Sequence, residues 1–355
     1  MLFSQEAKRI AMDLEILQQQ LQAFAIEHYG EAAVVSHVEV MPGHAGLSFG
    51  FEVDYQEDKL AQRESLVMRL PPKGVRQSGN TDVLRQVPLL RALKRNGVPV
   101  PTVRWFGSDL RWFEVPYIMV YRLPGRTFNP WEPDPSFDLN PQAVAHLYHQ
   151  GVRVLTQVHQ LDWQNELAGW EEPRSLEEEI RRWDPILARA AEPQWATQGQ
   201  EVRELLLERQ PQNPLIGLFH GDFQGTNFLF DGDTLVAVLD WEISGIGGQL
   251  LDLGWLLVFT DHESWDPSHR RLISSLPAAE ELVALYEEGM KRKVPDVAWY
   301  RALAGYRFGV IGCFNVMLHR RGRRYDPEWE EIAPSVPVLF SRAKEMLLGA
   351  GHTGR

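Results

Sequence analysis

The sequence predicts an α+β protein with a small, β-rich N-terminal lobe and a larger, mainly helical C-terminal lobe. Strand-like patterns concentrate between residues 34 and 121, helical patterns dominate from residue 141 onward, and a Pro-rich surface loop at 129–135 lies between them. Strands first and helices afterwards imply two lobes with a cleft between them. We assign residues 1–122 to the N-terminal lobe and 123–355 to the C-terminal lobe.

The N-terminal lobe begins with apolar residues at helical spacing, which predict an amphipathic helix over 4–28. Short runs bounded by Gly- and Asp-containing turns then predict five strands, at 38–40, 47–53, 65–70, 102–106 and 116–121. Between the third and fourth strands we expect a helix over 84–96. Gly97 closes this helix, and the prolines at 99 and 101 prevent its continuation.

The C-terminal lobe shows helical patterns interrupted by one island of strands. The expected helices lie at 141–160, 175–191, 198–209, 277–292 and 296–320. The island, residues 215–243, alternates short apolar runs with turn residues, which predicts a strand, a loop and two further strands.

Composition restricts the classes of partner. The chain has 355 residues, 44% of them hydrophobic, and its net charge of −12 argues against nucleic acid or an anionic membrane as the main partner. The single cysteine, Cys313, permits no intramolecular disulfide and lies in an apolar run, so we expect a buried, inert thiol. Neither a signal-peptide pattern nor a membrane-length apolar run is evident, and we expect a cytoplasmic protein.

Three polar side chains stand out in the island: Asp222, Asn227 and Asp240. Taken singly, Asp222 or Asn227 would be read as a turn or cap residue. Taken together, they match the needs of phosphoryl transfer, in which one carboxylate accepts the proton of a hydroxyl while other oxygen ligands hold Mg²⁺ against the phosphates of ATP. We therefore predict Asp222 as the catalytic base and Asn227 with Asp240 as the metal ligands.

The protein-kinase catalytic loop has Asp and Asn at this separation, with a metal-binding Asp beyond. Here His-Gly precedes Asp222 where protein kinases have His-Arg, and Asp-Trp-Glu at 240–242 stands where they have Asp-Phe-Gly. This variant resembles the aminoglycoside phosphotransferase and choline kinase family, closest in pattern to the phosphotransferases associated with acyl-CoA dehydrogenases. The resemblance extends over nearly the whole chain and implies a protein-kinase-like fold with ATP and Mg²⁺ as cofactors.

The resemblance also implies a nucleotide site in the N-terminal lobe. The phosphate-binding loop would contain Gly43, His44, Ala45, Gly46 and Ser48. Arg69 stands where most kinases have the Lys that binds the α- and β-phosphates, and Gln86 stands where its partner Glu is usual. The adenine would bind backbone groups around Tyr121 to Leu123.

Other residues have expected supporting roles. Met119 or Val120 would line the adenine pocket. The family usually has an Asp at position 252 that braces the catalytic loop, and we expect His159 to be a packed structural histidine. The acidic run 177–179 has the pattern of a solvated helix face.

The resemblance implies an ATP- and Mg²⁺-dependent transfer of the γ-phosphoryl group, in line, to a hydroxyl of a small molecule. Two acceptor classes stay open, one like a hydroxyacyl-CoA and one like an aminoglycoside. Candidate acceptor contacts are Trp241, Glu242, Arg307, Asn315 and Arg320. The Arg-rich segment 319–324 is either a site for a phosphate-bearing acceptor or a solvated helix end.

A competing hypothesis is a catalytically degenerate kinase fold that binds nucleotide or serves as a scaffold. Arg69 and Gln86 favour it, while the intact Asp222, Asn227 and Asp240 oppose it. Protein kinase activity is disfavoured, because no activation segment ending in Ala-Pro-Glu follows Asp240. The sequence leaves the oligomeric state open.

Overall fold

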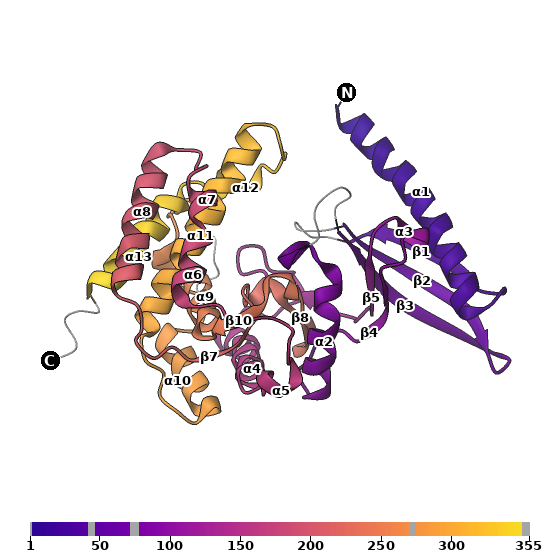
Figure 1. Ribbon diagram of the computed structural model, residues 1–355, viewed down its shortest axis with the longest axis horizontal. Helices are drawn as coiled ribbons and strands as arrows, with labels where there is room; N and C mark the ends of the chain where they lie inside the picture. The colour runs from indigo at the N-terminus through magenta and orange to yellow at the C-terminus, as the bar shows by residue number, and fades with distance from the viewer. Residues whose placement is uncertain (1, 42–46, 72–77, 270–274, 350–355) are drawn as a thin grey trace. The chain divides into compact units, whose positions relative to one another are not determined.

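The computed structural model describes residues 2–41, 47–71, 78–269 and 275–349. Its internal contacts divide the chain into two compact units, residues 1–124 and 125–355 (Figure 1). The first unit is built around a β-sheet, and the second is mainly helical with two small sheets. The α+β class and the succession of strands and helices predicted from the sequence are confirmed.

A five-stranded antiparallel sheet forms the first unit, in the order β1-β2-β3-β5-β4. Its strands are β1 (Val34–Val40), β2 (Leu47–Glu57), β3 (Leu60–Leu70), β4 (Val103–Gly107) and β5 (Tyr117–Tyr121). Strands β2 and β3 extend beyond the predicted ranges and join through Asp58 and Lys59. Both turn residues have positive φ, of 51° and 66°, which matches the twist of a two-residue hairpin.

Helix α1 (Leu2–Tyr29) covers one face of this sheet (Figure 1). Leu17, Leu21 and Phe24 of the helix are buried in one cluster with Phe51 and Met68 of the strands. Each such side chain stabilises the unit by roughly 1.5–3 kcal/mol relative to an exposed one. Two further helices complete the unit, α2 (Gln86–Arg95) and the short α3 (Leu110–Phe113).

A half-buried carboxylate ties α1 to the sheet. Glu64 of β3 accepts hydrogen bonds from the hydroxyls of Tyr29 (2.6 Å), Tyr55 (3.1 Å) and Tyr121 (3.3 Å). The guanidinium of Arg104 also donates to it, at 3.0 Å. Burial alone would raise the pKa of Glu64, but the bonds from Arg104 and Tyr29 outweigh it and hold this pKa below the ordinary value.

The second unit is organised around the long, mostly buried helix α11 (Val297–Arg320), which contacts α7, α8, α9, α12 and α13. The other helices are α4 (Pro141–His159), α5 (Trp163–Glu166), α6 (Leu176–Arg181), α7 (Asp184–Leu187), α8 (Pro193–Glu208), α9 (Leu250–Phe259), α10 (Ala279–Met290), α12 (Glu328–Ile332) and α13 (Ser335–Gly349). Among the described residues, no helix is long and apolar enough to cross a membrane.

The second unit also contains two small sheets, and the loops that carry the predicted site residues connect their strands. Strands β8 (Phe228–Asp231) and β9 (Thr234–Val238) form a hairpin that β6 (Arg126–Thr127) extends, and β7 (Ile216–Phe219) pairs with β10 (Gly245–Gly248). The hairpin turns at Gly232, whose φ of +63° suits glycine. The loop between β7 and β8 carries the predicted catalytic residue.

The helical segments depart from the predictions in three places. The helix expected over 175–191 is two short helices, α6 and α7, because Pro185 cannot continue an α-helical ladder. Helix α8 begins at Pro193, five residues before the predicted start, with proline in the first turn where its missing N–H costs nothing. Helices α3, α5, α9, α12 and α13 and strands β6 and β10 were not predicted.

Candidate active site

The loop after β7 depends on a glycine. Gly221 has φ of +91°, and a Cβ atom there would lie 2.7 Å from the backbone oxygen of Ile243. Both the backbone conformation and the close approach therefore require glycine at this position. This requirement gives a physical reason for the His-Gly-Asp sequence that precedes the strand pair.

A buried carboxylate braces the loop. Asp252 of α9 is fully buried and accepts the backbone N–H of His220 at 2.6 Å and that of Gly221 at 2.7 Å. His159 of α4 lies 3.3 Å from the same carboxylate through Nε2, and its Nδ1 lies 2.6 Å from the hydroxyl of Tyr286. The predicted bracing role of Asp252 and the structural role of His159 are confirmed.

His220 links the loop to the following hairpin. Its Nε2 contacts the carbonyl of Leu239 at 2.8 Å, so this nitrogen carries a proton. Its Nδ1 accepts the backbone N–H of Asp222 at 3.1 Å. The neutral imidazole therefore holds Asp222 and the residue before Asp240 in one arrangement.

Asp222 is partly buried, and its two carboxylate oxygens have different surroundings. Oδ1 accepts the indole N–H of Trp255 and the side-chain amide of Gln224, both at 2.7 Å. Oδ2 accepts the side-chain amide of Asn227 at 2.9 Å. Burial raises the pKa of Asp222 above its ordinary value, and the nearby Asp240 carboxylate acts in the same direction.

Asn227 and Asp240 lie beside this carboxylate. The amide nitrogen of Asn227 donates to the backbone oxygen of Asp222 at 2.8 Å and also to the Asp222 carboxylate. In this orientation the amide oxygen of Asn227, Oδ1, is the atom left to face another group. Asp240 has φ of +64° and ψ of 59°, an unfavourable conformation for a residue with a Cβ atom. Such strain is concentrated at functional sites.

These residues fit a magnesium ion. An amide oxygen and a carboxylate are oxygen donors of the kind that Mg²⁺ prefers, and Mg²⁺ typically takes only one or two protein carboxylates beside phosphates and waters. Among the described residues, no group of three or more His, Cys, Asp or Glu side chains is arranged to hold a metal.

Sequence reasoning missed three contacts of the site. Gln224 and Trp255 both bond to Asp222, and Arg307 of α11 donates to the backbone oxygen of Gly221 at 3.3 Å. Trp255 follows Asp252 by three residues on α9, so that both face the loop, and this spacing could have indicated it. Arg307 had been considered only as an acceptor contact.

The expectation for the acidic run 177–179 is wrong at Glu179. This side chain is 5% exposed and pairs with Arg174 at 2.6 Å and with Arg307 and Arg182 at 3.3 Å. The attraction of three arginines overcomes burial and lowers its pKa. Its two neighbours behave as surface residues, one pairing with Arg181 and the other capping α6 at Ser175.

The predicted nucleotide residues of the first unit lie on the central strands. Ser48 of β2 is directly opposite Arg69 of β3, so both side chains lie on the same face of the sheet. The predicted loop residues Gly43, His44, Ala45 and Gly46 lie outside the described residues. Gln86 is 6% exposed, and its Nε2 has no hydrogen-bond partner within the described part of the chain.

The register distinguishes the two candidates for the adenine pocket. Met119 pairs with Met68 and is fully buried in the cluster under α1, on the face opposite Arg69. Val120 pairs with Val67 and so shares the face of Arg69. Of the two residues predicted for the adenine pocket, only Val120 therefore lies on the face of the sheet that carries Arg69. The backbone amides of Tyr121 and Arg122 already bond to Thr102 and Ser65, which leaves Leu123 as the amide to test.

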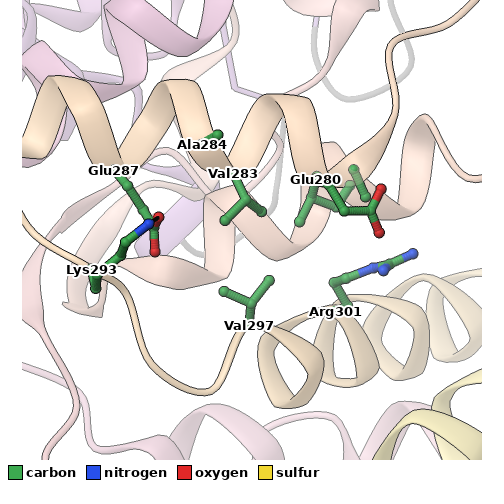
Figure 2. Close-up of a pocket in the computed structure, with 9 residues that line it drawn as sticks. Glu280, Val283, Ala284, Glu287, Lys293, Val297 and Arg301 are labelled. Carbon is green, nitrogen blue, oxygen red and sulfur yellow. Dashed lines mark hydrogen bonds and ion pairs between the residues drawn. The ribbon is translucent and has the colours of Figure 1, made fainter.

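Several residues predicted to contact the acceptor instead bind other groups of the chain. Arg320 pairs with Glu192 at 2.6 Å and with Glu330 at 2.7 Å, which favours the helix-end interpretation of the Arg-rich segment. Asn315 donates to the backbone of its own helix at 3.2 Å. A surface pocket of about 370 Å³, lined by residues that include Glu280, Glu287 and Arg301, contains none of the predicted site residues (Figure 2).

Comparisons with known proteins identify the family and the fold of the chain. The model of a family described as "Phosphotransferase enzyme family" matches residues 45–305. A putative aminoglycoside phosphotransferase from Ralstonia eutropha has a similar structure, with a TM-score of 0.72 and 21% identity over 92% of this chain and 98% of that one. A choline/ethanolamine kinase family protein from Mesorhizobium loti gives a TM-score of 0.58 at 17% identity, over 93% of this chain and 99% of its own. These likenesses establish a kinase-like fold.

The curated relatives, at higher identity, are longer proteins that this chain matches only in part. Acyl-CoA dehydrogenase family member 11 of Homo sapiens is 26% identical over 260 residues, which are 70% of this chain and 33% of that protein. Acyl-CoA dehydrogenase family member 10 of Mus musculus is 28% identical over 202 residues, 56% of this chain and 18% of that protein. The chain thus spans about a third or less of these two relatives.

Proposed function

Because the chain belongs to the phosphotransferase enzyme family, with a kinase-like fold, we propose that it transfers the γ-phosphoryl group of ATP to a hydroxyl of a small molecule. The main support for this proposal is the set of hydrogen bonds to the Asp222 carboxylate. Three donors fix a carboxylate at the start of a loop, next to an amide and a second carboxylate suited to Mg²⁺.

In this mechanism Asp222 accepts the proton of the acceptor hydroxyl as that oxygen attacks phosphorus. Asn227 and Asp240 would hold Mg²⁺, which neutralises charge on the phosphates when bound. Arg69, on the face that it shares with Ser48, would bind the phosphates, and backbone groups at Tyr121 to Leu123 would bind the adenine. No covalent phosphoenzyme forms, because the hydroxyl attacks ATP directly and ADP leaves.

The names of relatives and structural neighbours, rather than a pocket, suggest which acceptor classes to test first. The curated relatives carry the name of acyl-CoA dehydrogenases, which supports a hydroxyacyl thioester as the first acceptor to test. One structural neighbour, an aminoglycoside phosphotransferase with a TM-score of 0.57 at 14% identity, is described in complex with ADP and hygromycin B. Aminoglycosides are accordingly the second class.

The first test is a calorimetric titration with ATP, with and without Mg²⁺, because it requires no knowledge of the acceptor. We expect binding that depends on Mg²⁺ and that Asp240→Ala abolishes, while Asp138→Ala, an exposed carboxylate of the same unit, retains it. A transfer assay with hydroxyacyl-CoAs and aminoglycosides follows. Asp222→Asn should lower kcat by roughly 10²- to 10⁴-fold, the range for a general base.

Three results would contradict the proposed function or one of its residue assignments. Absence of ATP binding in both titrations would support the degenerate scaffold. The structural argument for that hypothesis is the buried Gln86, whose amide nitrogen has no hydrogen-bond partner among the described residues. Turnover of Asp222→Asn within threefold of the unmodified protein would remove Asp222 as the base. An unchanged Mg²⁺ titration in Asp240→Ala would remove Asp240 as a ligand.

A further inference from the structure

The two oxygens of the Asp222 carboxylate are not equivalent. Each oxygen of a carboxylate can accept about two hydrogen bonds. Among the described residues, Oδ1 accepts two hydrogen bonds, from Trp255 and Gln224, whereas Oδ2 accepts one, from Asn227. Oδ2 therefore has a lone pair available for a further donor such as a substrate hydroxyl.

Trp255 determines this asymmetry from a rigid position. Its side chain is 2% exposed and stacks on Phe259 with ring centres 5.4 Å apart. It lies one turn beyond Asp252 on α9, so the same face of one helix holds the backbone before Asp222 and the carboxylate itself. The indole N–H only donates hydrogen bonds, so its role is orientation and not proton transfer.

Arg307 contacts both the Trp255 ring and the backbone of the loop just before Asp222. Its guanidinium carbon lies 4.9 Å from the Trp255 ring centre, and Nη2 donates to the Gly221 oxygen at 3.3 Å. The side chain is 1% exposed and pairs with Glu179, which is also buried. A buried ion pair is seldom more stabilising than apolar residues of the same size, so packing alone does not account for an arginine here.

We propose that Trp255 and Arg307 are positioning residues that orient Asp222 so that Oδ2 is the oxygen that takes the acceptor's proton. Trp255 occupies Oδ1 through its N–H, and Arg307 holds both the indole ring and the Gly221 carbonyl. This inference rests on the proposed function, because it assigns an orientation to the base named there.

Trp255→Phe removes the N–H and keeps an aromatic ring in the cluster. We expect kcat for Mg²⁺-dependent ATP hydrolysis, in which water takes the place of the acceptor, to fall about 10- to 100-fold, the effect of losing one hydrogen bond to a charged group. KM for ATP should stay within twofold. The matched control is Trp265→Phe, since Trp265 lies in the same cluster but bonds to the backbone oxygen of Val258, and its kcat should stay within twofold.

The role of Arg307 is tested by coupling to Trp255. Arg307→Met should lower kcat at unchanged KM, and Arg307→Lys should recover part of the loss because it keeps a charge near the ring. If both residues act through Asp222, the double variant Trp255→Phe with Arg307→Met should lose little more than the worse single variant. Losses that multiply, or a kcat of Trp255→Phe within twofold of the unmodified protein, would overturn the proposal.

A second measurement keeps this test separate from the proposed function. In protein labelled with ¹⁵N-tryptophan, the indole N–H resonance missing from Trp255→Phe identifies Trp255. Asp222→Ala should move this resonance by removing its acceptor, even if the protein never hydrolyses ATP. An unmoved resonance would overturn the inference. Failure of the proposed function would appear instead as no ATP hydrolysis by the unmodified protein with the resonance still responding to Asp222→Ala.

Discussion

Replacing Asp252 with Asn should lower the free energy of unfolding by about 2.5–6 kcal/mol. Asp252 accepts two backbone N–H groups, one on each oxygen, in a fully buried position. Asparagine has one acceptor oxygen and one NH₂ group, so either orientation of its amide leaves one backbone N–H facing another donor. The loss combines a hydrogen bond to a charged group, about 1.5–3 kcal/mol, with a buried unpaired donor, about 1–3 kcal/mol.

The assay is equilibrium urea unfolding followed by tryptophan fluorescence, with Asp138→Asn as the control. Asp138 also accepts a backbone N–H, that of Asn140 at 3.0 Å, but it is exposed, so water replaces a lost bond and the expected change is under about 0.5 kcal/mol. A loss below about 1 kcal/mol for Asp252→Asn would show that the two amides find other acceptors. The bracing argument would then be refuted.

Four further changes test other parts of the structure. Hydrogen bonds hold the pKa of Glu64 below its ordinary value of 4.5, so the stabilisation is present at neutral pH and lost as the pH falls through the lowered pKa. Glu64→Gln should therefore flatten the loss of stability below about pH 4.5 in urea unfolding, and an unchanged acid profile would contradict this. Burial raises the pKa of the Cys313 thiol to about 12, so a disulfide reagent should label it only after denaturation, and rapid native labelling would count against its burial. Gln86→Leu should change stability by less than about 1 kcal/mol, because the buried amide nitrogen has no partner among the described residues; a loss above 2 kcal/mol in the same assay would reveal one. Gly221→Ala should lower the free energy of unfolding by about 1–3 kcal/mol and lower kcat for ATP hydrolysis, because the residue has φ of +91° and a Cβ atom would meet the oxygen of Ile243. Unchanged stability and rate would refute the requirement for glycine.

Local features of the site could be predicted from the sequence. Asp222, Asn227 and Asp240 lie within one loop and hairpin, so their separation along the chain largely determines their proximity. The brace at Asp252 was expected because of the resemblance to a family. The carbonyl and amide contacts of His220, by contrast, become visible only when the hairpin closes onto the loop.

Features that depend on burial from all sides could not be predicted. Helix α9 is buried along its whole length, so its apolar residues show no 3.6-residue period to distinguish a helix from a strand. Glu179 resembles its exposed neighbours in sequence, and only the packing of α11 brings Arg307 to it. Met119 and Val120 are adjacent apolar residues of one strand, and only the register with β3 shows which face of the sheet each of them occupies.

The hydrogen bonds that Asp252 accepts also predict how fast the amides of His220 and Gly221 exchange with solvent. Loops that carry function usually exchange their amide protons quickly, through small local openings. The amides of His220 and Gly221 instead donate to a carboxylate at the start of a fully buried helix, which is also in contact with His159. Their exchange with solvent deuterium should require the separation of α9 from the loop, so the segment next to the proposed base should be among the slowest-exchanging parts of the second unit.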